Sequence, residues 1–251
     1  MRALFALGLS AVSSLFALAC SSEERAAQEC RITGPFGSGR GQVWLLRPST
    51  APSSLVLFAH GWTAVQPTDW HRPRLDHLCA HGSVVVFPRY QVDELDTFEL
   101  GVDGFRKGVR TAFARLDDAD VPVVAVGYSF GGALVNYYAA HAARWGVPAP
   151  DNVYSIFPTT RVAGRPVGKP PPSVDFTLFA GDRDEVVGTA GAEDFMVWLK
   201  SYGVERRSYR VVRSSDALIA SHEAPKETTA ASTEAFWAPI DELVAAAEES
   251  R

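Results

Sequence analysis

Short apolar runs of strand length alternate along the chain with longer segments in which apolar residues recur at helical spacing. Several of the short runs are continuously apolar, as in Val84-Val85-Val86-Phe87, and this is typical of strands that are buried on both faces. Strands are predicted over residues 42–46, 55–59, 84–88, 121–126, 153–157, 175–180 and 207–212. This alternation predicts an α/β fold with a mostly parallel central sheet and helices on both of its faces.

Three apolar stripes predict helices that pack against this sheet. Their members are Phe98, Val102, Phe105, Val109, Phe113 and Leu116; then Phe195, Trp198, Leu199 and Tyr202; and last Phe236, Ile240, Leu243, Val244 and Ala247. Glycines at 101, 104 and 108 weaken the first helix prediction, and Pro239 leaves the start of the last one open.

The first nineteen residues predict a secretory signal peptide, because Arg2 is followed by an apolar run that serines interrupt and that no basic flank closes. The small residues of Ala17-Leu18-Ala19 stand directly before Cys20. This arrangement resembles a bacterial lipoprotein box, which implies acylation of Cys20; plain secretion is the alternative. We therefore expect export from the cytoplasm, either to a membrane anchor on the periplasmic or cell-surface face or as a secreted protein. Residues 20–35 are assigned to a tether and residues 36–251 to one domain.

Composition and charge limit the possible partners. Apolar residues make up 47% and charged residues 21% of the chain, as in ordinary globular proteins. The net charge of −5 does not indicate a basic surface that would bind nucleic acid. Beyond Cys20 only Cys30 and Cys79 are present. In an oxidising compartment they form a disulfide, or Cys79 stays a separate thiol buried on a helix. Neither cysteine has a partner at metal-ligand spacing, so no metal site is expected.

The main chemical signal is Gly127-Tyr128-Ser129-Phe130-Gly131, a G-x-S-x-G run between a predicted strand and a segment of helical period, residues 133–145. A sharp strand-to-helix turn exposes the serine hydroxyl and strains its backbone, and the glycines leave room for neighbouring chain. Ser129 is therefore the candidate nucleophile. The alternative is a glycine-rich turn with an incidental serine.

A serine nucleophile needs a base and a carboxylate that orients the base. His141 lies about three turns into the helix after Ser129 and is carried away from it, so His222, in the loop after the last predicted strand, is the candidate base. Asp182 and Asp184 follow the strand that ends near Gly181. We choose Asp184 as the orienting acid, and Asp182 is interpreted as a turn residue.

Two backbone N–H groups must also stabilise the oxygen that becomes negative. Phe130 supplies one, since it follows the nucleophile, and Trp62 supplies the other from the loop after an earlier strand. His60, in the same loop, is interpreted as a residue that fixes the loop and not as a base.

In this order the His60-Gly61-Trp62 loop, the serine turn, Gly181-Asp182-Arg183-Asp184 and Ser221-His222 resemble the α/β-hydrolase family, over residues 42–251. The resemblance implies a Ser-His-Asp hydrolase without cofactor, similar to small carboxylesterases, dienelactone hydrolases and polyester hydrolases, and it favours Asp184 as the acid. We expect cleavage of small carboxylic esters through an acyl-enzyme. Peptidase, thioesterase or acyltransferase activity uses the same triad, and a ligand-binding lipoprotein without catalysis is a further alternative. The stretch after Phe157 is too short for a large helical lid, so we expect an open site.

Overall fold

A sheet of eight strands runs through the part of the chain that the computed structural model describes, residues 29–116 and 120–250. The strands lie in the order β1-β2-β4-β3-β5-β6-β7-β8. They are β1 (Cys30–Phe36), β2 (Val43–Pro48), β3 (Ser54–Ala59), β4 (Ser83–Pro88), β5 (Val123–Tyr128), β6 (Asn152–Ile156), β7 (Asp175–Gly181) and β8 (Arg207–Val212). β2 is antiparallel to β1 and to β4, and every other pairing is parallel. The prediction of a mostly parallel sheet is confirmed.

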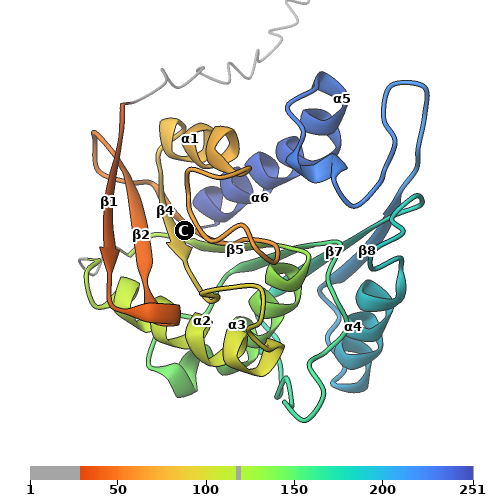
Figure 1. Ribbon diagram of the computed structural model, residues 1–251, viewed down its shortest axis with the longest axis horizontal. Coiled ribbons are helices and arrows are strands. Elements are labelled where there is room, and N and C mark those ends of the chain that lie inside the picture. The colour runs from red at the N-terminus through yellow and green to blue at the C-terminus, as the bar shows by residue number, and fades with distance from the viewer. Residues whose placement is uncertain (1–28, 117–119, 251) are drawn as a thin grey trace, which may run out of the picture.

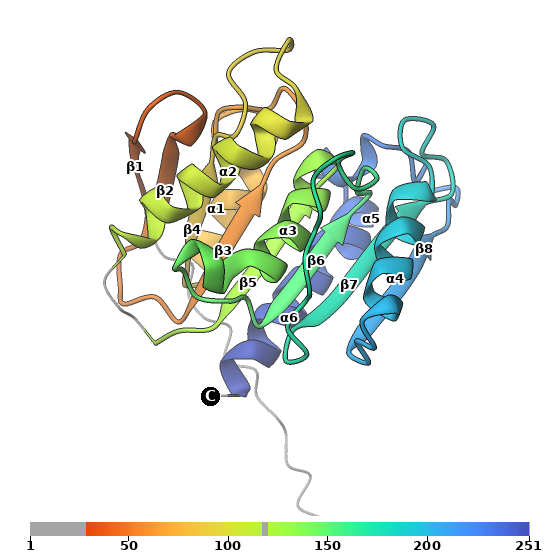
Figure 2. The ribbon, with the colours of Figure 1, turned by 90° about the horizontal axis from the view of Figure 1, so that it is seen from below.

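Helices cover both faces of the sheet. Figure 1 shows α1 (Arg72–Ala80), α5 (Ala230–Ser232) and α6 (Ala238–Glu249) above it, and α2 (Phe98–Phe113), α3 (Phe130–Trp145) and α4 (Ala190–Ser201) below it. Figure 2 shows the second group side by side across the sheet. Pro239 lies in the first turn of α6, where a missing N–H costs nothing, and a π-helical turn, Thr233–Trp237, precedes it.

Alternate residues of a central strand pack into two separate cores, one on each face of the sheet. On β3, Leu55 and Leu57 point to the core beneath α2, α3 and α4, while Val56 and Phe58 point to the core beneath α1 and α6. A strand with this pattern is apolar at every position, which explains the continuous runs in the sequence.

The three glycines of α2 allow close packing. All are buried, and a Cβ atom on Gly104 would lie 2.7 Å from the carbonyl oxygen of Tyr90, while one on Gly101 would lie 2.7 Å from the ring of Phe130. The tertiary contact therefore outweighs the low helix propensity of glycine.

The assignment of residues 20–35 to a tether is wrong for its last part, because residues 30–35 belong to the edge strand β1. Side chains of β1 are exposed or half-buried, and Gly34-Pro35 interrupts the run, so the apolar signal of a strand is weak. Residues 1–28, with the predicted signal peptide and Cys20, lie outside the described residues.

Cys30 and Cys79 form a disulfide that joins β1 to α1, with their Cα atoms 6.0 Å apart. The structure therefore contains the predicted disulfide and not the alternative of two separate thiols. The bond closes a loop between residues 49 positions apart, which in the chain-entropy model stabilises the folded state by about 4 kcal/mol.

The segment between β6 and β7 contains no helix, so no helical lid is inserted there. Within residues 29–116 and 120–250, no helix is both long and apolar enough to cross a membrane.

Candidate active site

Ser129 stands alone between the end of β5 and the start of α3, in a backbone conformation that residues with a side chain rarely adopt (φ 57°, ψ −123°). The two glycines of the motif bring neighbouring chain against this turn. A Cβ atom on Gly127 would lie 2.1 Å from the carbonyl oxygen of Gly131, and one on Gly131 would lie 2.1 Å from that of Ala59. Only glycine fits either position, and the serine is held at the carboxyl end of the central strand.

His222 meets this serine from the loop after β8. Its Nε2 lies 3.0 Å from Ser129 Oγ. The loop is anchored beside the serine, because the hydroxyl of Tyr128 donates to the carbonyl oxygen of His222 at 2.6 Å. His141 lies elsewhere, with its Nε2 3.3 Å from the carbonyl oxygen of Pro166.

Asp184, in the loop after β7, completes the chain of contacts. Its Oδ2 lies 2.8 Å from His222 Nδ1, and its Oδ1 accepts from the backbone N–H groups of Val186 and Val187 at 2.9 and 3.1 Å. Burial acts to raise the pKa of this carboxyl, but the hydrogen bonds from His222 and the two amides outweigh it and keep the pKa below its ordinary value. Asp184 is therefore a carboxylate that fixes the ring of His222.

Asp182 does not contact His222 but bonds to Ser214. Its Oδ1 accepts from both the backbone N–H and the hydroxyl of Ser214, at 3.0 and 2.6 Å, and the Ser214 hydroxyl accepts from the N–H of Ala220. These bonds tie the end of β7 to the loop that carries His222. The interpretation of Asp182 as a local turn residue is thus corrected to a link between two loops.

The loop after β3 lies directly against the serine turn. A Cβ atom on Gly61 would lie 3.5 Å from Ser129 Cβ and 2.7 Å from the ring of Tyr128. Within the part of the chain that the structure describes, the backbone N–H groups of Trp62 and Phe130 have no hydrogen-bond acceptor. Both predicted amides are therefore free beside Ser129.

His60 is fully buried and lies between the rings of Tyr90 and Phe87, at centroid distances of 4.0 and 5.2 Å. Its Nδ1 donates to the carbonyl oxygen of Gly61 at 2.5 Å. Burial lowers the pKa of His60 to about 3, so the ring is neutral near pH 7. The ring fixes the loop, in agreement with the interpretation drawn from sequence.

A cavity of about 810 Å³ opens over Ser129 and His222. Trp62, Thr63, Trp70, Tyr128, Val186, Glu223, Lys226 and Glu227 complete its lining. The side chain of Phe130 does not contribute, because its ring is fully buried against Phe98.

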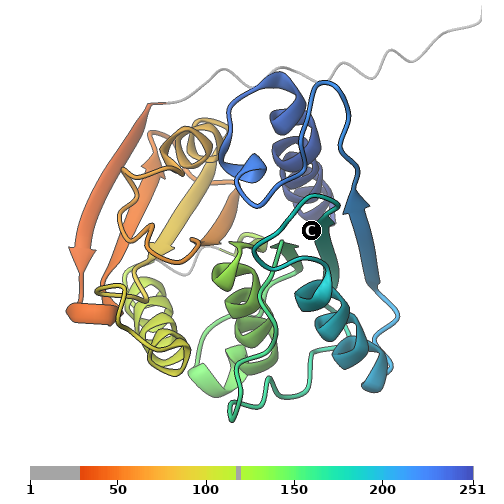
Figure 3. The ribbon, with the colours of Figure 1, turned by 45° about the vertical axis from the view of Figure 1, so that its right-hand side comes forward.

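Several lining residues carry no motif in the sequence. The ammonium of Lys226 lies 3.9 Å above the ring of Trp70 and pairs with Glu223. Figure 3 shows the C-terminal segment, in blue, beside α1. Only the fold brings these distant segments together, so no local pattern could have found them.

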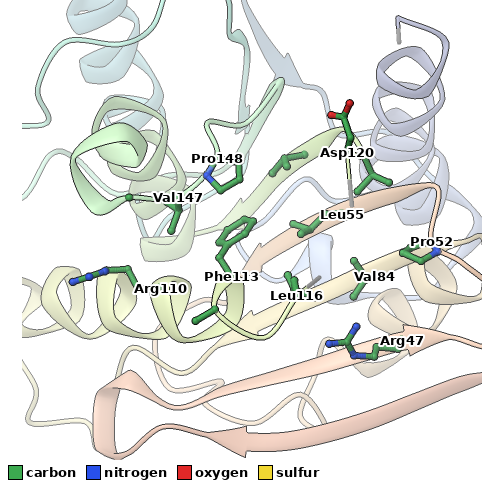
Figure 4. Close-up of a pocket in the computed structure, with 14 residues that line it drawn as sticks. Arg47, Pro52, Leu55, Val84, Arg110, Phe113, Leu116, Asp120, Val147 and Pro148 are labelled. Atoms are coloured by element: carbon green, nitrogen blue, oxygen red, sulfur yellow. The ribbon is translucent and has the colours of Figure 1, made fainter. Parts of the chain in front are cut away.

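A second cavity, of about 620 Å³, lies at the opposite end of the strands, between the end of α2 and the starts of β3 and β5. Figure 4 shows Leu55, Val84, Phe113 and Val147 around it, with Arg47 and Arg110 at its margin. Ser129, Asp184 and His222 do not line it. As for metals, residues 29–116 and 120–250 contain no group of three His, Cys, Asp or Glu side chains that could hold an ion.

Solved structures with the same architecture are numerous, although no family model and no curated protein matches the sequence. MGS-M1, an α/β hydrolase enzyme from a Medee basin deep-sea metagenome library, is 13% identical over 89% of this chain and 99% of its own, with a TM-score of 0.65. Esterase B from Lactobacillus rhamnosis is 14% identical over 90% and 88%, with a TM-score of 0.67. A thermostable esterase from Pseudomonas putida is 14% identical over 84% and 81%, with a TM-score of 0.61. The chain therefore has the α/β-hydrolase fold.

The buried histidines predict a loss of stability in mild acid. Burial lowers the pKa of His60 to about 3, so this ring stays neutral in the folded state at pH 5, and burial also lowers the pKa of His71 well below 6.5. In the unfolded chain they bind protons below about pH 6.5, and stability must fall with pH in that window. The share of His60 alone predicts that the free energy of unfolding, measured with urea, drops by about 1.5 kcal/mol between pH 6.5 and pH 5, and His71 adds to this drop.

His71→Phe provides the control. It removes one of the two buried histidines and keeps an aromatic ring in the place where His71 contacts Phe58 and Tyr128. The drop should be smaller in this variant, which keeps the share of His60. A wild-type free energy of unfolding that is the same at both pH values would contradict the assignment of neutral histidines.

Proposed function

We propose that this protein is a serine hydrolase that cleaves small carboxylic esters through an acyl-enzyme, with Ser129 as nucleophile, His222 as base and Asp184 as orienting acid. The observation that carries the proposal is the pair of contacts that His222 makes, 3.0 Å to Ser129 Oγ and 2.8 Å to Asp184 Oδ2, at a strained turn that opens into a cavity. Serine hydroxyls are poor nucleophiles until a base takes their proton, and this arrangement supplies the base.

In the first half of the reaction, Ser129 Oγ attacks the ester carbonyl carbon while its proton passes to His222 Nε2. The carbonyl oxygen becomes negative and accepts hydrogen bonds from the free amides of Trp62 and Phe130. Asp184 accepts from Nδ1–H and stabilises the imidazolium. The carbon–oxygen bond to the alcohol then breaks, and the alcohol leaves with the proton that His222 returns.

In the second half, water enters the cavity and gives a proton to His222 Nε2 as it attacks the acyl carbon. The negative oxygen of the new tetrahedral intermediate accepts hydrogen bonds from the same two amides. Collapse breaks the bond to Ser129, which regains its proton, and releases the carboxylic acid. Apart from the ester and this water, every group that the two halves use belongs to the chain.

The solved structures of similar fold support an ester substrate. They include esterase B from Lactobacillus rhamnosis, for which a tributyrin phosphonate complex is described. Trp62, Trp70 and Val186 give the cavity an apolar wall, which suits an apolar acyl or alcohol group.

We further propose that the activity is located outside the cytoplasm, at a membrane through acyl chains on Cys20 or in secreted form. The apolar N-terminal run and Cys20 support export. The Cys30–Cys79 disulfide also supports it, since such bonds persist in oxidising compartments.

Ser129→Ala should remove the nucleophile and lower the turnover of p-nitrophenyl butyrate by on the order of 10⁵–10⁶-fold. The thermal unfolding midpoint should stay close to that of the wild type, because the hydroxyl contacts only His222 among the described residues. Near-wild-type turnover in the variant would exclude Ser129 as the nucleophile. A wild-type enzyme that prefers the matched amide or thioester would reassign the substrate class.

Two aspartates allow a matched comparison of the acid. Asp184→Asn places an amide against His222 Nδ1 and disfavours the required tautomer, so kcat should fall by about 10⁴-fold. Asp182→Asn keeps the Oδ1 that accepts both bonds from Ser214, and kcat should stay within about threefold of wild type. Initial rates at saturating ester test this order, and the opposite ranking would move the role of acid to Asp182.

A further inference from the structure

We propose that Gln91 is a positioning residue for the oxyanion site, and that it acts by holding Thr63 in a left-handed conformation so that the preceding amide, that of Trp62, faces the substrate. The inference rests on the proposed ester hydrolysis and adds to it a residue from a different loop, the one that follows β4.

Thr63 has a φ of 74°, in the region that favours glycine. Its side chain is β-branched, and such residues are rarely found there because the branch crowds the backbone. The conformation therefore persists only where surrounding contacts impose it. Among the described residues, only Ser129 and Phe157 share a positive φ without being glycine, and both lie at the carboxyl ends of strands next to the site.

Two backbone bonds bend the chain here, from the Ala64 N–H to the Gly61 oxygen at 3.4 Å and from the Val65 N–H to the Thr63 oxygen at 2.9 Å. Gln91 adds the side-chain contact that holds the Thr63 N–H in this turn. The Thr63 N–H donates to Gln91 Oε1 at 2.7 Å, and Gln91 Nε2 donates to the carbonyl oxygen of Asp93 at 2.8 Å. Gln91 is 1% exposed, so its amide is shielded from water and depends on these two partners. An N–H group at one end and a carbonyl at the other fix which way the amide points.

The Trp62 amide is thus held between two fixed peptide groups. The peptide before Trp62 is fixed at its carbonyl end, because His60 Nδ1 donates to the Gly61 oxygen at 2.5 Å. In a trans peptide the N–H points opposite to the carbonyl, so this bond turns the Trp62 N–H away from His60. The peptide after Trp62 is fixed at its N–H by Gln91. Removing Gln91 releases one of these two constraints and leaves the other intact.

Gln91→Met tests the proposal, since methionine has a similar length and no amide. Without the bond, Thr63 can leave the left-handed region and the Trp62 amide is misaligned with the developing oxyanion. We expect kcat for p-nitrophenyl butyrate to fall by about 10–100-fold, while KM changes by less than about threefold. The inhibition constant of a trifluoromethyl ketone should rise by the same factor as kcat/KM falls, because its tetrahedral adduct places an oxygen at the same amides.

Arg89→Met is the matched control. Arg89 donates to the carbonyl oxygens of Gln91 and Val92 and to the side chain of Gln42, so its loss loosens the same loop without breaking the bond to Thr63. Its kcat should stay within about threefold of wild type at a comparable loss in thermal midpoint. Equal losses of kcat in the two variants, or an undiminished kcat in Gln91→Met, would overturn the proposal.

Two further measurements keep the test decisive. If Gln91→Met does not fold, Gln91→Asn removes one methylene and cannot span both partners, and the same loss of kcat is expected. Amide hydrogen exchange needs no substrate: the Thr63 N–H should be protected in the wild type and in Arg89→Met, and exposed to exchange in the Gln91 variant. Lack of wild-type ester turnover would count against ester hydrolysis, whereas unchanged Thr63 exchange in the Gln91 variant would count against the positioning role.

Discussion

The candidate site depends on one steric constraint, the close approach of three backbone segments at the end of β5. Ser129 adopts a positive φ there because the first turn of α3 folds back against β5 and against the end of β3, at distances that only Gly127 and Gly131 permit. This packing fixes the nucleophile and also places the loop of Gly61 against it. A side chain at either glycine would separate the serine from the oxyanion loop, and the geometry of the whole site would be lost.

Around this turn, side chains from separate segments hold one another in place by buried and half-buried hydrogen bonds. Tyr128 holds the carbonyl of His222, and Asp182 holds Ser214 and through it the same loop. On the other side, His60 and Gln91 hold the two peptides that flank Trp62. These bonds fix the loop of His222 and the two peptides that flank Trp62 relative to the serine turn. Such preorganisation is what electrostatic stabilisation of an oxyanion requires.

The sequence predicts much of this because the relevant signals are local. Continuous apolar runs mark strands buried on both faces, and the glycines at 127 and 131 report the close approach that the structure shows. Residues 30–35 carry no such signal, because an edge strand that is half-exposed to water has no apolar run. Trp70, Lys226 and Gln91 could not be assigned, since their roles arise from contacts between segments far apart in the chain. Phe130 illustrates a further limit: its position was predicted, but the direction of its ring depends on packing against Phe98.

The most direct measurement of an activated serine is intact-protein mass spectrometry after brief exposure to a fluorophosphonate, followed by peptide mapping. An ordinary serine hydroxyl does not react at neutral pH, so the reagent reports the combined effect of the turn, the imidazole and the amides. A single adduct on Ser129, formed within minutes and lost when His222 is replaced by alanine, is the predicted result. A correctly folded protein that takes up no reagent, or that takes it up on another residue, would contradict the assignment of Ser129 as an activated nucleophile.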